Sequence, residues 1–179
     1  MPTDVRPDAP LASLAALLRG TLAGVDTAVA VHALADLLRR QPPTPGLLAG
    51  LSRRATSAGP TSHLLHAEEG FSLVALELRP GQATSVHDHL TWCVVTVLRG
   101  TESEARYTLD GDRLRWLGES RNLTGSVTAL TPPGDIHRVA CAGDTTAVSF
   151  HVYGADLRVV GSSVRRTYHL PVAHDEEIR

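Results

Sequence analysis

The chain has 179 residues, of which 42% are hydrophobic and 20% charged, and its formal net charge at pH 7 is −2. This length is enough for one domain with a sizeable core, and the near-neutral charge lacks the basic footprint of a nucleic-acid-binding protein. With no stretch of ~18 apolar residues to span a membrane and no secretory signal pattern in the first ten residues, we expect a cytoplasmic protein without membrane or nucleic-acid partners.

Residues 1–58 carry helical patterns. Leucines recur at helical spacing between residues 11 and 18. The same spacing predicts a second helix over 25–40, which ends at the two prolines that follow Gln41. Pro45 then opens a predicted third helix over 47–54. We expect these helices to pack on the outside of the β-domain that follows.

Residues 59–170 carry strand and turn patterns. Alternating apolar residues predict strands over 71–78, 91–98, 104–109, 114–117, 127–130, 136–140 and 147–153. A hairpin signal centred on Gly111 separates the third of these strands from the fourth. Many short strands at close spacing predict a sandwich or a small barrel. The organisation is therefore one domain, with helices in 1–58, a β-barrel in 59–170 and a charged tail in 171–179.

Two groups of polar residues follow the alternation of strands. His87 and His89 lie one residue apart, so on a strand both point to the same face. His137 follows on another predicted strand and could complete a metal site of three imidazoles. Imidazole suits iron, zinc, copper and nickel, so these ligands alone do not identify the metal.

The second polar group lies on the last predicted strand. Ser149, His151 and Tyr153 share one face of it, while Phe150 and Val152 share the other. We interpret the two polar groups as parts of one active site.

The spacing of glycines and histidines resembles the two sequence motifs of the cupin superfamily. Five residues separate Gly81 from His87 in the first motif, which Gly100 closes. The second motif, Pro-x-Gly-x-x-His, ends at His137. The resemblance covers roughly residues 70–155.

The glutamate that many cupins carry after the histidine pair is replaced here by Cys93, counted back from Gly100. A three-histidine cupin that lacks this glutamate and carries Ser-x-His-x-Tyr resembles the cysteine dioxygenase family of thiol dioxygenases. The resemblance implies a mainly β cupin fold, a jelly-roll barrel with an N-terminal helical segment. It implies non-haem Fe(II) on His87, His89 and His137, and a catalytic relay of Tyr153, His151 and Ser149.

The activity implied by the resemblance is the oxidation of a small thiol by O2 to its sulfinic acid. Cysteine and 3-mercaptopropionate are the substrates of known members. Two alternatives stay open on the residues alone: a cupin metalloenzyme of other chemistry, and a non-catalytic cupin that binds a metal or a small ligand.

Cys93 allows two interpretations. In animal members of the family, a cysteine at this position forms a thioether with the active-site tyrosine, so a crosslink between Cys93 and Tyr153 is one hypothesis. The other is a buried, inert cysteine on a core strand.

The substrate-binding residues depart from the family pattern. Members specific for cysteine bind its carboxylate with an arginine just before the strand predicted over 71–78, and relatives that oxidise mercaptopropionate carry glutamine there. The matching position here is Ser62. A thiol without a carboxylate would need no replacement for the arginine; the candidate replacements are His63, His66, Arg53, Arg54, Arg158, Arg165 and Arg166.

Overall fold

The computed structural model describes residues 9–48 and 59–173. The N-terminal part contains helices α1 (Ala9–Leu22) and α2 (Thr27–Arg40) and the short 3-10 helix η1 (Pro45–Leu48). A third helix α3 (Leu157–Val160) precedes the last two strands. The strands are β1 (Thr61–Glu68), β2 (Phe71–Leu78), β3 (Val86–His89), β4 (Cys93–Arg99), β5 (Thr101–Asp110), β6 (Arg113–Leu123), β7 (Val127–Leu130), β8 (His137–Cys141), β9 (Ala147–Tyr153), β10 (Val164–Tyr168) and β11 (Val172–Ala173).

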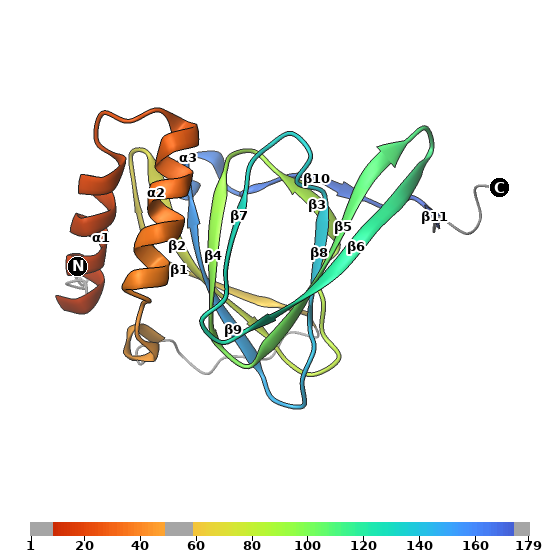
Figure 1. The fold of residues 1–179 in the computed structure, drawn as a ribbon, viewed down its shortest axis with the longest axis horizontal. Helices are drawn as coiled ribbons and strands as arrows, with labels where there is room; N and C mark the ends of the chain where they lie inside the picture. The colour runs from red at the N-terminus through yellow and green to blue at the C-terminus, as the bar shows by residue number, and fades with distance from the viewer. Residues whose placement is uncertain (1–8, 49–58, 174–179) are drawn as a thin grey trace, which may run out of the picture.

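The strands form two sheets that curl toward each other and enclose a common interior (Figure 1). One sheet has five strands in the order β1-β2-β9-β4-β7, and the other has six in the order β10-β3-β8-β5-β6-β11. Neighbouring strands of the described residues pair in antiparallel fashion, except β11 and β6, which are parallel. This arrangement confirms the predicted cupin-type barrel.

Helices α1 and α2 cover the outer face of the five-stranded sheet (Figure 1), as the sequence predicted. Leu34 and Leu38 of α2 pack in one buried cluster with Phe150 and Val152 of β9. The Asp26 side chain accepts a hydrogen bond from the Ala28 backbone N–H and so caps the start of α2.

Several predicted elements match the structure. The strands predicted over 71–78, 127–130 and 147–153 coincide with β2, β7 and β9. The predicted hairpin is formed by β5 and β6, in which Asp110 pairs with Arg113 and Gly111 takes a φ of 62°. Residues 25–40 were predicted as one helix, and α2 begins two residues later, after its Asp26 cap.

Other elements differ from the sequence prediction or were missed by it. The third helix, expected over 47–54, is represented by η1, and residues 49–58 lie outside the described part of the chain. Strands β1, β10 and β11 and helix α3 were not predicted as elements, and β3 lies outside the predicted ranges although its two histidines were expected on a strand. Strand β11 falls inside the segment 171–179 that was expected to be a tail, of which 174–179 are not described.

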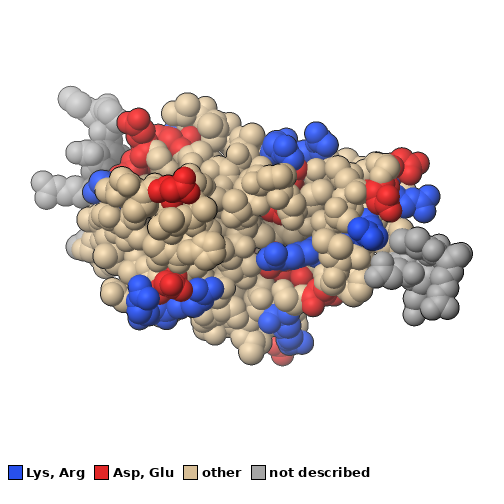
Figure 2. Space-filling model, turned by 45° about the horizontal axis from the view of Figure 1, so that its top comes forward, with Lys and Arg blue, Asp and Glu red and all other residues tan. Residues whose placement is uncertain are grey.

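The described helices are all too short or too polar to cross a membrane. On the face shown in Figure 2, arginine and carboxylate side chains are interspersed rather than separated by sign.

Candidate metal centre

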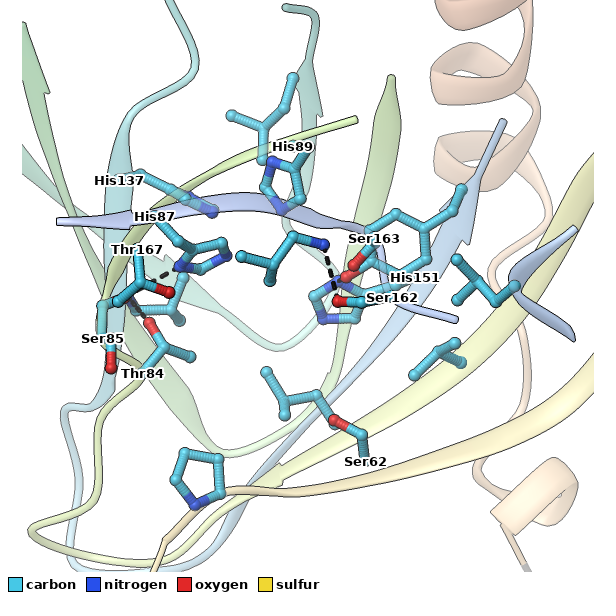
Figure 3. A pocket seen from close by; sticks show the side chains of 18 of the residues that line it. Ser62, Thr84, Ser85, His87, His89, His137, His151, Ser162, Ser163 and Thr167 are labelled. Atoms are coloured by element: carbon cyan, nitrogen blue, oxygen red, sulfur yellow. Dashed lines mark hydrogen bonds between the residues drawn. The ribbon is translucent and has the colours of Figure 1, made fainter. Parts of the chain in front are cut away.

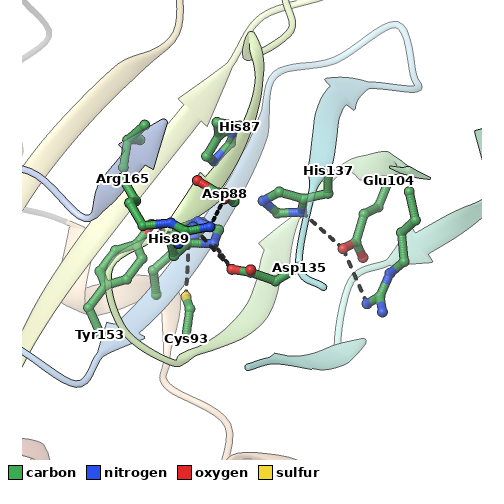
Figure 4. Close-up of polar contacts among 12 residues, drawn as sticks. His87, Asp88, His89, Cys93, Glu104, Asp135, His137, Tyr153 and Arg165 are labelled. Carbon is green, nitrogen blue, oxygen red and sulfur yellow. Dashed lines mark hydrogen bonds and ion pairs between the residues drawn. The ribbon is translucent and has the colours of Figure 1, made fainter. Parts of the chain in front are cut away.

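Three histidines meet inside the barrel. His87 and His89 come from β3, and His137 begins β8, where its Cα pairs directly with that of His87. One potential ligand atom from each ring lies within 4.8 Å of the others. The period-two spacing of β3 and its pairing with β8 therefore bring together the three predicted ligands (Figures 3 and 4).

The second ring nitrogen of each histidine is held by an acceptor, which fixes the tautomer. The Nδ1–H groups donate from His87 to the Ser85 carbonyl (2.9 Å), from His89 to Asp135 Oδ2 (2.9 Å) and from His137 to Glu104 Oε1 (3.0 Å). This leaves the three Nε2 atoms free to bind a metal. The Nε2 atom of His137 is buried without a hydrogen-bond partner, which fits a site built for a divalent transition metal.

The electrostatics of the site keep two of its histidines neutral. Burial, followed by the neighbouring His137, lowers the pKa of His87 to about 4. The same two causes lower the pKa of His89, although its hydrogen bond to Asp135 opposes them. Neutral imidazole is the form that coordinates a metal, so these rings are ready to bind one at neutral pH.

Asp135 and Glu104 were not among the site residues predicted from the sequence. Asp135 lies two residues before His137, inside the motif that identified that ligand, so a search for acceptors near the motif could have found it. Glu104 comes from β5, and it reaches His137 because β5 pairs with β8. Burial alone would raise the pKa of Glu104, but its hydrogen bond with His137 and the charge of Arg106 lower it.

A chain of polar groups lies across the barrel from the metal centre. The Tyr153 hydroxyl lies 3.1 Å from His151 Nδ1, and His151 Nε2 lies 2.9 Å from Ser149 Oγ. Burial lowers the pKa of His151 to about 3, so its ring is neutral at physiological pH. The ring centroids of Tyr153 and His89 are 5.9 Å apart. The three predicted metal ligands thus lie on the six-stranded sheet, whereas the polar chain of Tyr153, His151 and Ser149 lies on the five-stranded sheet.

Cys93 lies next to this chain. Its Cα pairs with that of Tyr153 across β4 and β9, and its Sγ is 3.8 Å from His151 Nδ1. The side chain is fully buried. Burial raises the pKa of its thiol well above the ordinary value, against a hydrogen bond with Tyr153 that lowers it.

A cavity of about 530 Å³ opens onto the three histidines, His151 and Tyr153 (Figure 3). Its hydroxyl-bearing side chains, besides Tyr153, are Ser62, Thr84, Ser85, Ser162, Ser163 and Thr167. Aliphatic side chains such as Leu64, Val74 and Leu76 form much of the remaining wall. Within residues 9–48 and 59–173, no arginine, aspartate or glutamate lines this cavity.

The candidate substrate-binding residues differ in whether they line the cavity. Ser62 lines the cavity, whereas His63, the next residue along β1, does not; its Nε2 lies 3.6 Å from Glu77 Oε1. Arg165 also lies outside the lining, because it forms an ion pair with the buried carboxylate of Asp88 (Figure 4). The structure therefore gives no support for His63 or Arg165 as substrate contacts.

Of the remaining candidates, the three that the structure describes add no contact to the cavity. Arg158 pairs with Asp156, His66 pairs with Glu68, and the Arg166 guanidinium lies 5.6 Å from the centroid of the Tyr168 ring. Arg53 and Arg54 lie outside the described residues. Asp88, which lies between His87 and His89 on β3, does not line the cavity and accepts a hydrogen bond from the Tyr168 hydroxyl.

Comparison with known proteins gives both a family and similar structures. Residues 52–162, more than half of the chain, match the family model described as cysteine dioxygenase type I. A cupin superfamily protein from Desulfitobacterium hafniense is 15% identical, with a TM-score of 0.46 over 65% of this chain and 93% of that one. An oxalate decarboxylase from Bacillus subtilis is 17% identical, with a TM-score of 0.48 over 57% of this chain and 27% of that one.

Proposed function

Because the chain belongs to the cysteine dioxygenase type I family, we propose that it is a non-haem Fe(II) dioxygenase that oxidises a small thiol with O2. The product would be the sulfinic acid, in which both oxygen atoms end on sulfur. The observation that carries this proposal is the shared cavity, onto which three histidines and the Tyr153 side chain open together.

His87, His89 and His137 would hold Fe(II), each through its Nε2 atom. Bound iron would supply the redox chemistry that joins a thiol to dioxygen, and a ligand set of three neutral imidazoles leaves positions open for both. Asp135 and Glu104 orient two of the rings and increase their basicity through the Nδ1–H hydrogen bonds.

The polar chain of β9, formed by Tyr153, His151 and Ser149, would interact with the dioxygen that enters the cavity. The Tyr153 hydroxyl is placed to hydrogen-bond a group in the cavity, with His151 and Ser149 behind it to fix its orientation. The aliphatic wall around Val74 and Leu76 limits the access of water to the reacting atoms. No organic cofactor is required.

The substrate would be cysteine or a related thiol such as 3-mercaptopropionate. Among the described residues, its polar end would meet hydroxyls such as those of Ser62 and Ser162 rather than a guanidinium. Hydroxyls bind carboxylates less strongly than the bidentate arginine clamp does. We therefore expect a weaker preference for carboxylate-bearing thiols than in members that carry the arginine.

The test is to load the protein with Fe(II) and measure O2 uptake with cysteine, 3-mercaptopropionate and cysteamine, together with the product masses. A product heavier than its thiol by two oxygen atoms supports the proposal. Disulfide or peroxide formation without sulfinate, or no O2 uptake with any thiol, contradicts it and favours another metal-dependent chemistry on this fold.

Replacing Tyr153 by phenylalanine should preserve iron binding and slow thiol oxidation by about 10- to 100-fold. This is the usual effect of removing a hydrogen-bonding group that surrounds a metal site without binding the metal. The reason is that the hydroxyl, which lies 3.1 Å from His151 Nδ1, is removed while the ring stays in place. Steady-state rates and iron content measured on the same preparation check this. Wild-type turnover in the variant would show that the polar chain of β9 takes no part in the reaction.

A second prediction concerns the thioether between Cys93 and Tyr153. The two residues pair across adjacent strands, and both side chains lie in one buried cluster, so we expect turnover with iron, thiol and O2 to join them. Intact-mass measurement of the reduced protein should then show the loss of two hydrogens, and Cys93→Ala should abolish that loss. An unchanged mass after many turnovers would identify Cys93 as an inert core residue.

A further inference from the structure

A buried carboxyl group, that of Glu102 on β5, lies at the inner end of the polar chain. Its side chain is 2% exposed, and its Oε1 atom is buried without a hydrogen-bond partner. It lines a small second cavity, of about 20 Å³, together with His137 and His151. Burying a carboxyl without an ion-pair partner lowers the stability of the fold. Neither the metal centre nor the larger cavity in which the thiol would bind, called the thiol cavity below, explains why this carboxyl is there.

The polar chain of β9 lies between this carboxyl and the larger cavity of about 530 Å³. Tyr153, which lines the thiol cavity, contacts His151 Nδ1, and His151 Nε2 contacts Ser149 Oγ. Glu102 and His151 line the same small cavity, and Ser149 is the hydroxyl that lowers the pKa of the Glu102 carboxyl against the effect of burial. Four side chains from two sheets therefore lie in series between the larger cavity and a single acid in the interior.

The groups that face Glu102 favour a carboxyl that exchanges its proton near neutral pH. Burial raises its pKa to about 7, Ser149 acts against this, and the charge of Glu104 on the same strand adds to it. Across the small cavity it faces His137 of β8, His151 of β9 and the neutral Asn122 of β6. The described lining of that cavity contains no arginine that would hold the carboxyl ionised.

The direction of every hydrogen bond in the chain depends on this one carboxyl. When Glu102 is ionised, it accepts from Ser149, Ser149 accepts from His151 Nε2–H, and His151 Nδ1 accepts from the Tyr153 hydroxyl. When Glu102 is protonated, it donates to Ser149, Ser149 donates to Nε2, and His151 donates its Nδ1–H to Tyr153. The Tyr153 proton then points into the cavity. The two states differ by one proton and by the tautomer of His151.

We propose that Glu102 is the inner end of a proton relay, which takes up the proton that the thiol loses when it becomes a thiolate in the cavity. This inference rests on the proposed function. In the step, the S–H bond breaks and its proton goes to the Tyr153 oxygen. The Tyr153 proton passes to His151 Nδ1, the Nε2 proton to Ser149, and the Ser149 proton to Glu102. The products are a thiolate and a neutral Glu102, with no net change in charge.

The neighbouring groups suit this role. Burial lowers the pKa of His151 to about 3 and raises that of Tyr153 well above its ordinary value. Neither group therefore keeps the charged form, and each passes a proton on. Glu102 is the group in the chain that can hold the proton near neutral pH, so in this step Glu102 stores it while His151 and Ser149 transmit it.

The test compares Glu102→Gln with Glu119→Gln, the same substitution at an exposed site on β6. The glutamine amide can donate to Ser149 as a protonated carboxyl does, but it cannot ionise. The first measurement is 15N NMR of the histidine rings in zinc-loaded protein, with His151→Asn identifying the His151 signals. In the wild type and in Glu119→Gln, His151 should change from the Nδ1–H to the Nε2–H tautomer as the pH rises through the pKa of Glu102. In Glu102→Gln it should stay Nδ1–H.

The second measurement is the pH profile of kcat with iron and the best thiol. In the wild type kcat should rise with pH as Glu102 ionises and becomes able to accept a proton. In Glu102→Gln this rise should disappear, and kcat at high pH should fall at least about 100-fold, the low end of the contribution of a proton-transfer group.

A His151 tautomer that does not change with pH in the wild type, or that still changes in Glu102→Gln, would overturn the relay. The two proposals fail separately. A tautomer switch that depends on Glu102 in a protein that oxidises no thiol would refute the dioxygenase and leave the proton path in place.

Discussion

Replacing His137 by alanine should abolish iron binding and thiol oxidation together. His137 supplies one of three converging nitrogens, and its buried Nε2 has no other partner. The change also leaves the buried Glu104 carboxylate without the Nδ1–H that it accepts. The loss of iron affinity should therefore exceed the about 10- to 100-fold that follows from removing only the outer partner of a ligand.

Iron content after reconstitution and desalting, with O2 uptake measured on the same samples, checks this prediction. His32→Ala is the matched control because His32 is an exposed histidine on α2 whose ring contacts the Ala28 carbonyl. It should bind iron and turn over like the wild type. Full iron occupancy with full O2 uptake in His137→Ala would refute the assignment of the ligands.

Replacing Phe150 by alanine should lower the free energy of unfolding by about 3–5 kcal/mol, the usual cost of removing a large aromatic side chain from a packed core. Phe150 is fully buried and packs in the cluster that joins β9 to α2. Its two strand neighbours, Ser149 and His151, face the opposite side of the sheet, so the change removes apolar contacts without removing a polar one.

Urea denaturation followed by circular dichroism measures this effect. Val159→Ala, on the exposed surface of α3, should change the free energy of unfolding by less than about 0.5 kcal/mol. A loss below about 1 kcal/mol for Phe150→Ala would mean that the helical layer contributes little to the stability of the barrel.

The parts of the site that lie within one strand could be predicted from the sequence. The alternation of β9 separated Ser149, His151 and Tyr153 from Phe150 and Val152, and the same alternation on β3 grouped His87 with His89. These predictions depend only on the period of an extended chain. The convergence of His137 on that pair came from the motif spacing, and the β3–β8 pairing is its structural cause.

The parts that depend on pairing between strands could not be predicted in this way. Glu104 is 33 residues from His137, and the two meet through the pairing of β5 with β8. Glu102 reaches the polar chain because β5 faces β9 across the interior. Alternation in the sequence marks Glu102 and Glu104 as sharing a face of β5, but it does not reveal what lies opposite them.

The position of Arg165 depends on an irregularity that the sequence does not show. The pairing of β10 with β3 shifts register between Val164 and Arg166. Val164 and Thr167 consequently line the cavity, while Arg165 and Arg166 do not. A shift of one residue moves side chains between the two faces of a sheet. Arg165, which was chosen as a candidate from its position in the sequence, therefore lies off the cavity wall.

For the proposed dioxygenase, the division of the site between the two sheets predicts that the catalytic rate depends on the distance between the sheets, whereas metal affinity does not. A small change in the spacing of the layers would move the phenol relative to the imidazoles and leave the triangle of nitrogens intact. Hydrostatic pressure, or mutations that loosen the helical cover of β9, would then slow turnover before any iron is released. Inactivation with full metal content is the expected early sign of damage in this barrel.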